Sequence, residues 1–149
     1  MASPATWIYC ALVTASNVEP DPHPAIRVCM MPADTNAHGT IFGGKILSLI
    51  DQAGAIGAHR LGIGRVVTVA MREVVFSQPV RVGDIVSCYA EILRVGRTSV
   101  TVCVRVVAHR PTDTKRSVEV TKAEVVYVAI DDAGRPVPIE ASSASSSSL

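Results

Sequence analysis

The chain has 149 residues, which is the length of one domain and excludes a large multidomain protein. Its 14 Lys and Arg against 13 Asp and Glu leave a formal charge of +1, and no basic run indicates a nucleic-acid-binding surface. Hydrophobic residues make up 48% of the chain but aromatic residues only 4%, so the core is expected to consist of Val, Ile, Leu and Ala.

The first 24 residues are expected to form an extension outside the folded domain. Residues 1–24 contain no Lys or Arg, and Pro20, Pro22 and Pro24 alternate where neither a helix nor a sheet ladder could form. The apolar run from Trp7 to Val13 is too short to cross a membrane and lacks the preceding basic residue of a secretory signal. We therefore predict a flexible extension and a cytoplasmic protein with no membrane or nucleic-acid partner.

A single long helix is predicted between Gly44 and Arg60. The apolar residues of this segment recur at helical spacing, and no proline occurs from residue 33 to residue 78. Apolar or small residues occupy almost every side of the segment, which predicts a helix enclosed on most of its surface.

Segments rich in Val predict a long antiparallel sheet. The first is Ile26–Met31, and four more follow the helix: Val66–Ser77, Asp84–Val95, Thr98–Arg110 and Ser117–Ile130, the last two separated by a polar loop at Pro111–Arg116. The expected fold class is α+β, with the sheet wrapped around one central helix, in a domain at residues 25–139. Residues 140–149 are a serine-rich tail, predicted to be disordered because too little of it is apolar.

Asp51 is the anomaly of the predicted helix. From Thr35 to His59 only Lys45 and Asp51 carry a formal charge. An enclosed carboxylate must be paired, hydrogen-bonded or neutralised, so Asp51 is a candidate catalytic base. The composition alone supports equally well that Asp51 lies along a polar strip with Ser48 and Gln52 and is simply solvated or capped.

The segment before the helix offers groups that could bind a carbonyl oxygen. It ends in Gly43 and Gly44, whose backbone N–H groups are unshielded by side chains and lie at the positive end of the helix dipole. A thioester or ester carbonyl fits such a place. Asn36 could hold a water or a carbonyl, although asparagine in a glycine-bearing loop is more often a turn former, and His38 is more simply a loop residue than a catalyst.

The sequence lacks the residues that several other classes of enzyme and metal site require. The run from Gly39 to Lys45 imitates the phosphate-binding pattern G-x-x-x-x-G-K, but Ile46 stands where the magnesium-binding Ser or Thr belongs. The four cysteines have neither a C-x-x-C pair nor a histidine spacing suited to zinc, and no G-x-S-x-G or H-E-x-x-H motif occurs. We therefore expect no metal site and no NTPase, serine hydrolase or zinc protease.

Motifs spread over about residues 27–136 form one combined pattern. In chain order they are Met31–Asn36, Gly39, Ile41–Gly44, Ile50-Asp51, Ala53–Ala55, Gly64–Ala70, Phe76 before Pro79, Val82–Asp84 and Val95–Ser99. Together they resemble the signature of the hot-dog-fold acyl-CoA thioesterases, closely that of the bacterial YciA-like group. The resemblance implies the hot-dog fold, which agrees with the predicted architecture, and a homodimer that is commonly assembled into a trimer of dimers.

The resemblance also implies a composite site between two subunits. Asp51 of one subunit would be the general base or nucleophile, and Asn36 of the other would position water or substrate. A backbone N–H of Gly43 or Gly44 would be the oxyanion donor. The nucleotide end of coenzyme A would contact the turn formed by Gly96, Arg97, Thr98 and Ser99. The implied reaction hydrolyses an acyl-CoA thioester to a free acid and coenzyme A, with no cofactor beyond the coenzyme A of the substrate.

Two residues depart from the family pattern, and two other functions stay open. Lys45 could favour acidic or phosphate groups or remain in solvent, and His38 is the only histidine near the glycines. A hot-dog hydratase or dehydratase would need such a histidine. A non-catalytic acyl-CoA-binding or regulatory module would fit a site with a single carboxylate.

Overall fold

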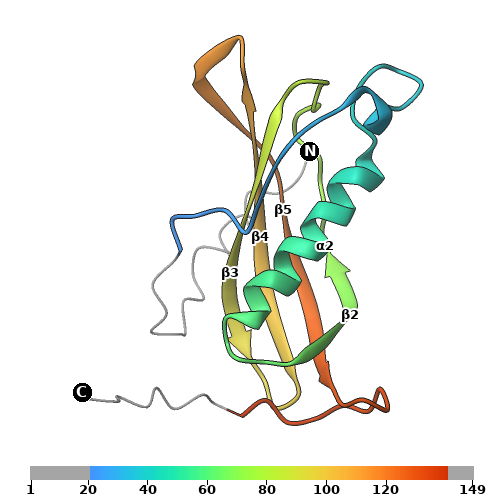
Figure 1. The fold of residues 1–149 in the computed structure, drawn as a ribbon, viewed down its shortest axis with the longest axis vertical. Helices are drawn as coiled ribbons and strands as arrows, with labels where there is room; N and C mark the ends of the chain where they lie inside the picture. Colours follow the sequence, from blue (N-terminus) through green and yellow to red (C-terminus); the bar gives the residue numbers. More distant parts are fainter. Residues whose placement is uncertain (1–20, 141–149) are drawn as a thin grey trace.

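The computed structural model describes residues 21–140, as one helix layered on a five-stranded antiparallel sheet (Figure 1). The predictions for residues 1–20 of the extension and 141–149 of the tail lie outside the described residues. The elements in chain order are β1 (Ile26–Cys29), the 3₁₀ turn η1 (Pro32–Asp34), α2 (Gly43–His59), β2 (Arg65–Arg72), β3 (Ile85–Val95), β4 (Ser99–Arg110) and β5 (Asp113–Ile130).

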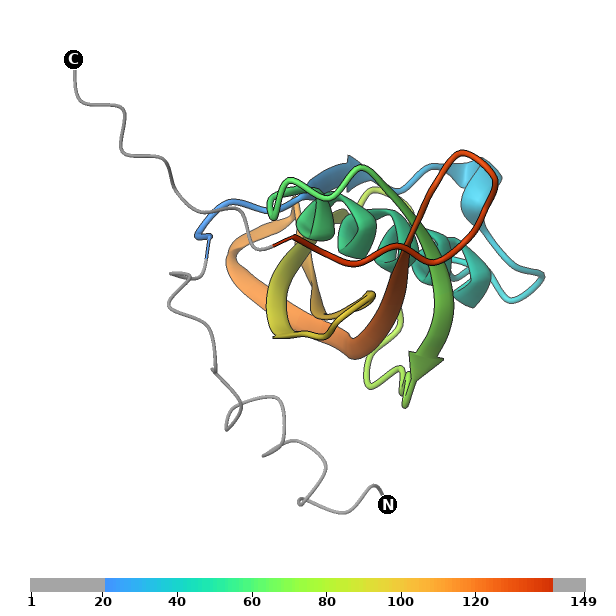
Figure 2. The same ribbon diagram turned by 90° about the horizontal axis from the view of Figure 1, so that it is seen from below.

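The sheet curls around the helix, as Figure 2 shows from below. The strand order is β1-β3-β4-β5-β2, so the strand before the helix and the strand after it form the two edges of the sheet. Alternate valines of β4, namely Val100, Val102, Val104 and Val106, are completely buried against the core. On the opposite face of this strand Thr101 and Cys103 are also buried, and only Arg105 is exposed. The predicted α+β class and the helix wrapped by a long antiparallel sheet are confirmed.

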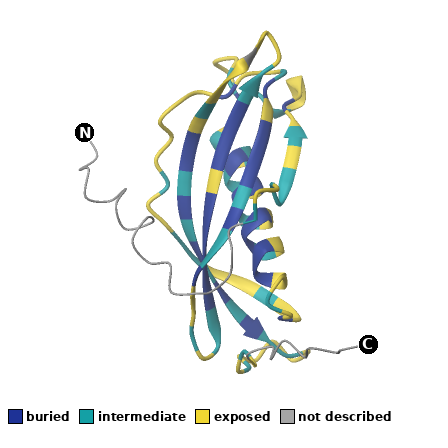
Figure 3. Cartoon of the chain, turned by 90° about the vertical axis from the view of Figure 1, so that its left-hand side faces the viewer, coloured by how far each residue is buried: buried dark blue, intermediate teal, exposed yellow. Residues whose placement is uncertain are grey.

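The curled sheet leaves one side of the helix uncovered. Ile46, Leu49, Ile50 and Ala53 are buried on the side of the sheet, and Figure 3 shows this division between buried and exposed sides. Ser48, Gln52 and Ile56 lie four residues apart and are exposed, which makes one uncovered stripe along the helix. The prediction of a helix enclosed on most of its surface holds for the remaining sides, because 12 of the 17 residues of α2 are buried or half-buried.

Two strand ends differ from the prediction by four residues or more. β2 ends at Arg72 and not at Ser77, because the next residue, Glu73, has φ +50, a conformation incompatible with a strand. β5 begins at Asp113, so much of the predicted loop Pro111–Arg116 belongs to a hairpin in which Arg110 faces Asp113. Pairing with β4 satisfies the backbone there, although the side chains are polar.

No helix within residues 21–140 has the length and apolar character needed to span a membrane. The cytoplasmic location stays a prediction.

Candidate active site

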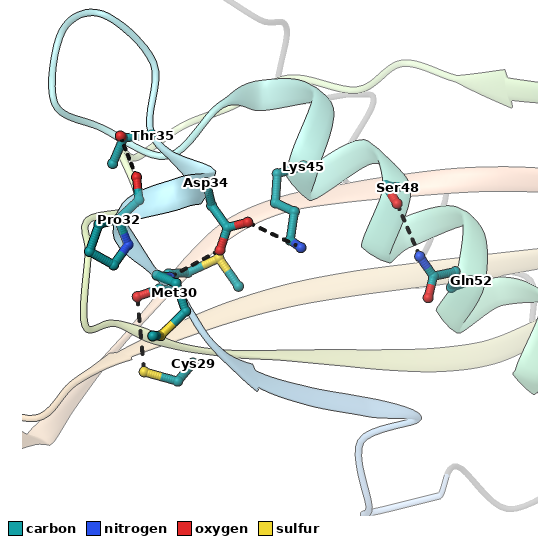
Figure 4. A network of polar contacts seen from close by, with 9 residues as sticks. Cys29, Met30, Pro32, Asp34, Thr35, Lys45, Ser48 and Gln52 are labelled. Carbon is teal, nitrogen blue, oxygen red and sulfur yellow. Dashed lines mark hydrogen bonds and ion pairs between the residues drawn. The ribbon is translucent and has the colours of Figure 1, made fainter.

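Asp51 lies half-buried near the middle of α2 and faces the edge strand β2. The hydroxyl of Thr68 on β2 donates a hydrogen bond of 2.5 Å to Oδ1 of Asp51. The expected polar strip has a different arrangement, because Nε2 of Gln52 donates to Oγ of Ser48 at 3.0 Å and these two residues pair with each other (Figure 4). Asp51 is therefore held by the sheet and not by its neighbours on the helix.

A second hydroxyl holds the same residue from β5. The side chain of Tyr127 is 1% exposed, and its hydroxyl donates a hydrogen bond of 2.6 Å to the backbone carbonyl oxygen of Asp51. Burial, followed by the nearby charge of Asp51, raises the pKa of Tyr127 above its ordinary value, so the hydroxyl remains a donor. Thr68 and Tyr127 face each other across the β2–β5 ladder.

No sequence motif predicts the roles of Thr68 and Tyr127 in holding Asp51. Thr68 lies within the motif Gly64–Ala70, and the register of the β2–β5 ladder shifts between Thr68 and Ala70. Tyr127 is a large polar-tipped side chain inside a Val-rich strand, which is a signal that a buried hydroxyl needs a partner. The identity of that partner depends on how the helix lies on the sheet, which the strand pattern does not give.

Asn36 lies in the loop before α2 with its side chain engaged locally. Its Oδ1 accepts hydrogen bonds from the backbone N–H of His38 at 2.9 Å and of Thr40 at 3.2 Å, and its Nδ2 donates to the Thr40 hydroxyl at 2.9 Å. This is the turn-forming role expected of asparagine in such a loop. The side chain of His38 is exposed.

The start of α2 presents backbone donors to its surroundings. Its N-cap residue is Phe42, whose side chain does not cap the helix, and the first N–H groups of any helix lack intrahelical partners. A Cβ atom at Gly43 would lie 3.5 Å from the ring of Phe76, and one at Gly44 would lie 3.4 Å from the ring of Phe42. Two half-exposed aromatic rings therefore flank the donors of Gly43 and Gly44.

A cavity of about 280 Å³ opens beside Gly43. Buried Ile41, Ile46 and Val80 contribute to its walls, and the Phe76 ring is at its edge. The polar residues Thr40, Ser77 and Gln78 also line it. No sequence motif predicts this cavity, because its walls come from segments far apart in the chain.

Lys45 makes an ion pair with Asp34 in this structure. The Nζ of Lys45 lies 3.2 Å from Oδ1 of Asp34 (Figure 4). Oδ2 of Asp34 accepts a hydrogen bond from the backbone N–H of Met31 at 3.0 Å. The Met31 N–H first, and then Lys45, hold the pKa of Asp34 below its ordinary value. Lys45 therefore joins the first turn of the helix to η1, so it does more than lie in solvent, although its side chain is 37% exposed.

The predicted coenzyme A turn lies at the opposite end of the molecule. Gly96 donates its N–H to the carbonyl of Ser99 at 2.7 Å, which closes the tight turn between β3 and β4, and the Arg97 side chain is exposed. Figure 1 shows this turn at the end of the sheet remote from the start of α2. Thr98 also anchors the turn, because its carbonyl accepts the N–H of Ala129 at 2.9 Å.

One protomer does not bring the predicted site residues together. Asp51 follows Gly43 by eight residues, and a rise of 1.5 Å per residue separates them by about 12 Å along the helix axis. The carboxylate and the Gly43 N–H therefore cannot both contact one carbonyl group within a protomer. Among residues 21–140, no group of three or more His, Cys, Asp or Glu could hold a metal ion.

The fold and this arrangement match one family. Residues 38–115 match the model of the thioesterase superfamily, and the chain belongs to that family and has its hot-dog fold. The acyl-CoA thioester hydrolase YciA of Escherichia coli strain K12 is 44% identical over 121 residues, which are 77% of this chain and 90% of that protein. The resemblance to the YciA-like group is thus confirmed.

Solved structures agree with this assignment. The crystal structure of Cj0915, a hexameric hotdog fold thioesterase of Campylobacter jejuni, has a TM-score of 0.75 and 47% identity, covering 79% of this chain and 90% of that one. HI0827, a hexameric broad specificity acyl-coenzyme A thioesterase, was solved as a variant with one aspartate replaced by alanine. That structure has a TM-score of 0.77 and 39% identity, covering 83% of this chain and 90% of that one.

Proposed function

We propose that this protein is an enzyme that hydrolyses acyl-CoA thioesters to a free acid and coenzyme A, with Asp51 as its general base or nucleophile. The observation that carries the proposal is the half-buried carboxylate of Asp51, held at 2.5 Å by Thr68. Its membership of the thioesterase superfamily and its relatives named acyl-CoA thioester hydrolases support the same reaction.

The proposed chemistry uses only groups of the chain and the substrate. Asp51 removes a proton from water, which attacks the thioester carbon, or its own oxygen attacks to form a mixed anhydride that water then hydrolyses. In both routes the C–S bond breaks and the coenzyme A thiolate takes a proton. Negative charge develops on the carbonyl oxygen, and the N–H of Gly43 or Gly44 stabilises it. We propose no metal ion and no further cofactor.

The separation along the helix supports a site shared by two protomers. Because Gly43 and Asp51 of one helix lie about 12 Å apart along its axis, the donor and the carboxylate that serve one carbonyl come from different chains in this proposal. Asn36 lies in the loop just before Gly43, so it would come from the same chain as the Gly43 N–H and not from the chain that supplies Asp51. In the assembled site its amide would have to exchange or share a bond that it now makes within its own loop.

The edge of the sheet next to Asp51 is suited to receive a second copy. β2 is an edge strand, and its Val67 and Val69 are 41% and 56% exposed. An unpaired, apolar edge favours pairing with another strand. We propose a homodimer joined there, in which the partner's elements run in the opposite direction, and its assembly into a trimer of dimers, as the hexameric relatives suggest.

We propose that the exposed Arg97 contacts the phosphates of coenzyme A. Gly96, Thr98 and Ser99 of the same turn complete this contact with the nucleotide end. A guanidinium is suited to phosphate oxygens, and this turn is held rigidly by backbone hydrogen bonds. The hydratase alternative gains no support, because His38 is exposed and contributes only its backbone N–H to the loop.

The test is coenzyme A release, measured with a thiol reagent over a series of acyl-CoA chain lengths. Wild-type protein is expected to release coenzyme A, and Asp51→Asn to lower turnover by about 10²–10⁴-fold while remaining folded. Asp113→Asn, an exposed aspartate at the β4–β5 turn, is the matched control and should retain activity. Binding without release would show a non-catalytic module, and full turnover by Asp51→Asn would refute the assignment.

A further inference from the structure

The hydroxyl of Tyr127 on β5 reaches Asp51, the helix residue that carries the proposed catalytic carboxylate. Within the described residues, no other hydroxyl on the buried face of β5 does so. Its side chain is among the largest that are fully buried, and its hydroxyl donates to the carbonyl oxygen of Asp51 at 2.6 Å. A hydroxyl removed from water requires a partner, which here is the backbone of Asp51 itself. Because the Tyr127 side chain is buried, its hydroxyl contacts the helix and not solvent.

The helix is shaped to admit this hydroxyl. Gly54 follows Asp51 by three residues and therefore lies on the same side of the helix. A Cβ atom at Gly54 would collide with the Tyr127 hydroxyl and would also lie 2.9 Å from two atoms of its ring. Glycine weakens a helix interior, so its presence here is explained by the space that Tyr127 occupies.

The two hydroxyls that hold Asp51 come from one cross-strand pair. Thr68 and Tyr127 are register partners across β2 and β5, and the register shifts directly after Thr68. Thr68 donates to the carboxylate of Asp51, and Tyr127 donates to its carbonyl. The sheet thus fixes both the backbone position and the carboxylate of this single helix residue.

We propose that Tyr127 is a positioning residue, which fixes the depth of α2 on the sheet so that Thr68 and Asp51 meet and the carboxylate points to the reacting group. This inference rests on the proposed function. A displacement of the order of 1 Å in a catalytic group lowers rates by up to about 100-fold, so a residue that acts through Asp51 affects kcat. Loss of the Tyr127 hydroxyl is expected to leave KM nearly unchanged, because the buried Tyr127 makes no contact with the substrate.

The experiment compares Tyr127→Phe with Tyr89→Phe by steady-state kinetics and thermal unfolding. Each variant loses one hydroxyl, and Tyr89 lies on β3, where its ring is 4.7 Å from the Arg105 guanidinium. The ring of Tyr127 is retained, and the Asp51 carbonyl keeps its place in the helix ladder, so the variant is expected to fold. We expect kcat to fall about tenfold in Tyr127→Phe with KM within about twofold, and both constants to be unchanged in Tyr89→Phe.

A double-mutant cycle with Thr68→Val distinguishes positioning of Asp51 by Tyr127 from a purely structural role of Tyr127. If both hydroxyls act through Asp51, the double variant loses less activity than the product of the two single losses. The inference is overturned by unchanged kcat in Tyr127→Phe, by strictly multiplicative losses, or by a Tyr127→Phe protein that does not fold. If wild-type protein hydrolyses no acyl-CoA, or Asp51→Asn stays active, the proposed function fails as well. If Asp51→Asn is inactive and Tyr127→Phe is fully active, only this inference fails.

Discussion

The Thr68 hydroxyl donates a hydrogen bond of 2.5 Å to the carboxylate of Asp51, which joins the edge strand to the central helix at the proposed site. The donor lies beside the irregularity in the β2–β5 ladder, where β2 gains one residue relative to its partner. Such irregularities redirect side chains and are frequent next to active sites. The position of the carboxylate therefore depends on the sheet edge as well as on the helix.

The Thr68 contact leads to a first prediction. Thr68→Val removes the donor at similar volume, and hydrogen bonds to charged groups contribute about 1.5–3 kcal/mol. We expect kcat/KM for acyl-CoA to fall by about tenfold or more. Thr68→Ser, which keeps the hydroxyl, should restore most of the activity. Equal activity of the Val and Ser variants would contradict a role for this hydrogen bond.

The packing of the helix on the sheet gives a second prediction. A Cβ atom at Gly57 would lie 2.7 Å from the Cβ of Ala90 on β3, a distance that real side chains do not adopt. Gly57→Ala is therefore expected to lower the free energy of unfolding by about 1–3 kcal/mol, measured by denaturant titration. At Gly64 a Cβ would meet nothing within 4 Å and φ is not positive, so Gly64→Ala is the control and should be nearly neutral. Equal stability of the two variants would argue against this close approach.

Asp34 provides a third prediction, on pH dependence. The folded-state pKa of Asp34 lies below its ordinary value of 3.8, first through the Met31 N–H and then through Lys45. Its charged form therefore stabilises the folded protein above that value, and the contribution is lost as the pH falls through the folded-state pKa. Wild type should be more stable than Asp34→Asn near neutral pH, and this difference should shrink below pH 3.8.

Denaturant unfolding at several pH values measures this difference. Lys45→Met is the companion variant, because it removes the ion pair but leaves the Met31 hydrogen bond intact and should show a smaller effect. A stability difference that stays constant or grows as the solution is acidified would contradict the assignment.

Much of the fold could be predicted because its signals are local. The helical spacing of Ile46, Leu49, Ile50 and Ala53 and the alternating valines of β4 each report on one element and its buried face. The polar run after Pro111 was mistaken for a loop, because pairing with β4 depends on a distant part of the chain and not on side-chain polarity. Edge positions and strand ends are decided by such tertiary contacts.

The site was harder to predict for the same reason. Asp51 stood out because a charge in an apolar helix is visible in the sequence. Whether it faced solvent or a partner depended on Thr68, which follows it by 17 residues, and on Tyr127, a further 59 residues along. The roles of Gly43 and Asn36 toward Asp51 stay predictions, because they require a second protomer that the sequence of one chain does not place.

Subunit complementation between two inactive variants tests most directly whether Asp51 and Asn36 of different chains form one site. Asp51→Asn and Asn36→Ala chains carrying different affinity tags are co-expressed, and the heteromeric species is isolated and assayed for coenzyme A release. If each site takes Asp51 from one chain and Asn36 from the other, a heterodimer contains one intact site and one doubly altered site. We predict that it recovers about half of the wild-type activity per dimer, whereas each variant alone stays inactive. A heterodimer as inactive as its parents would contradict the shared site.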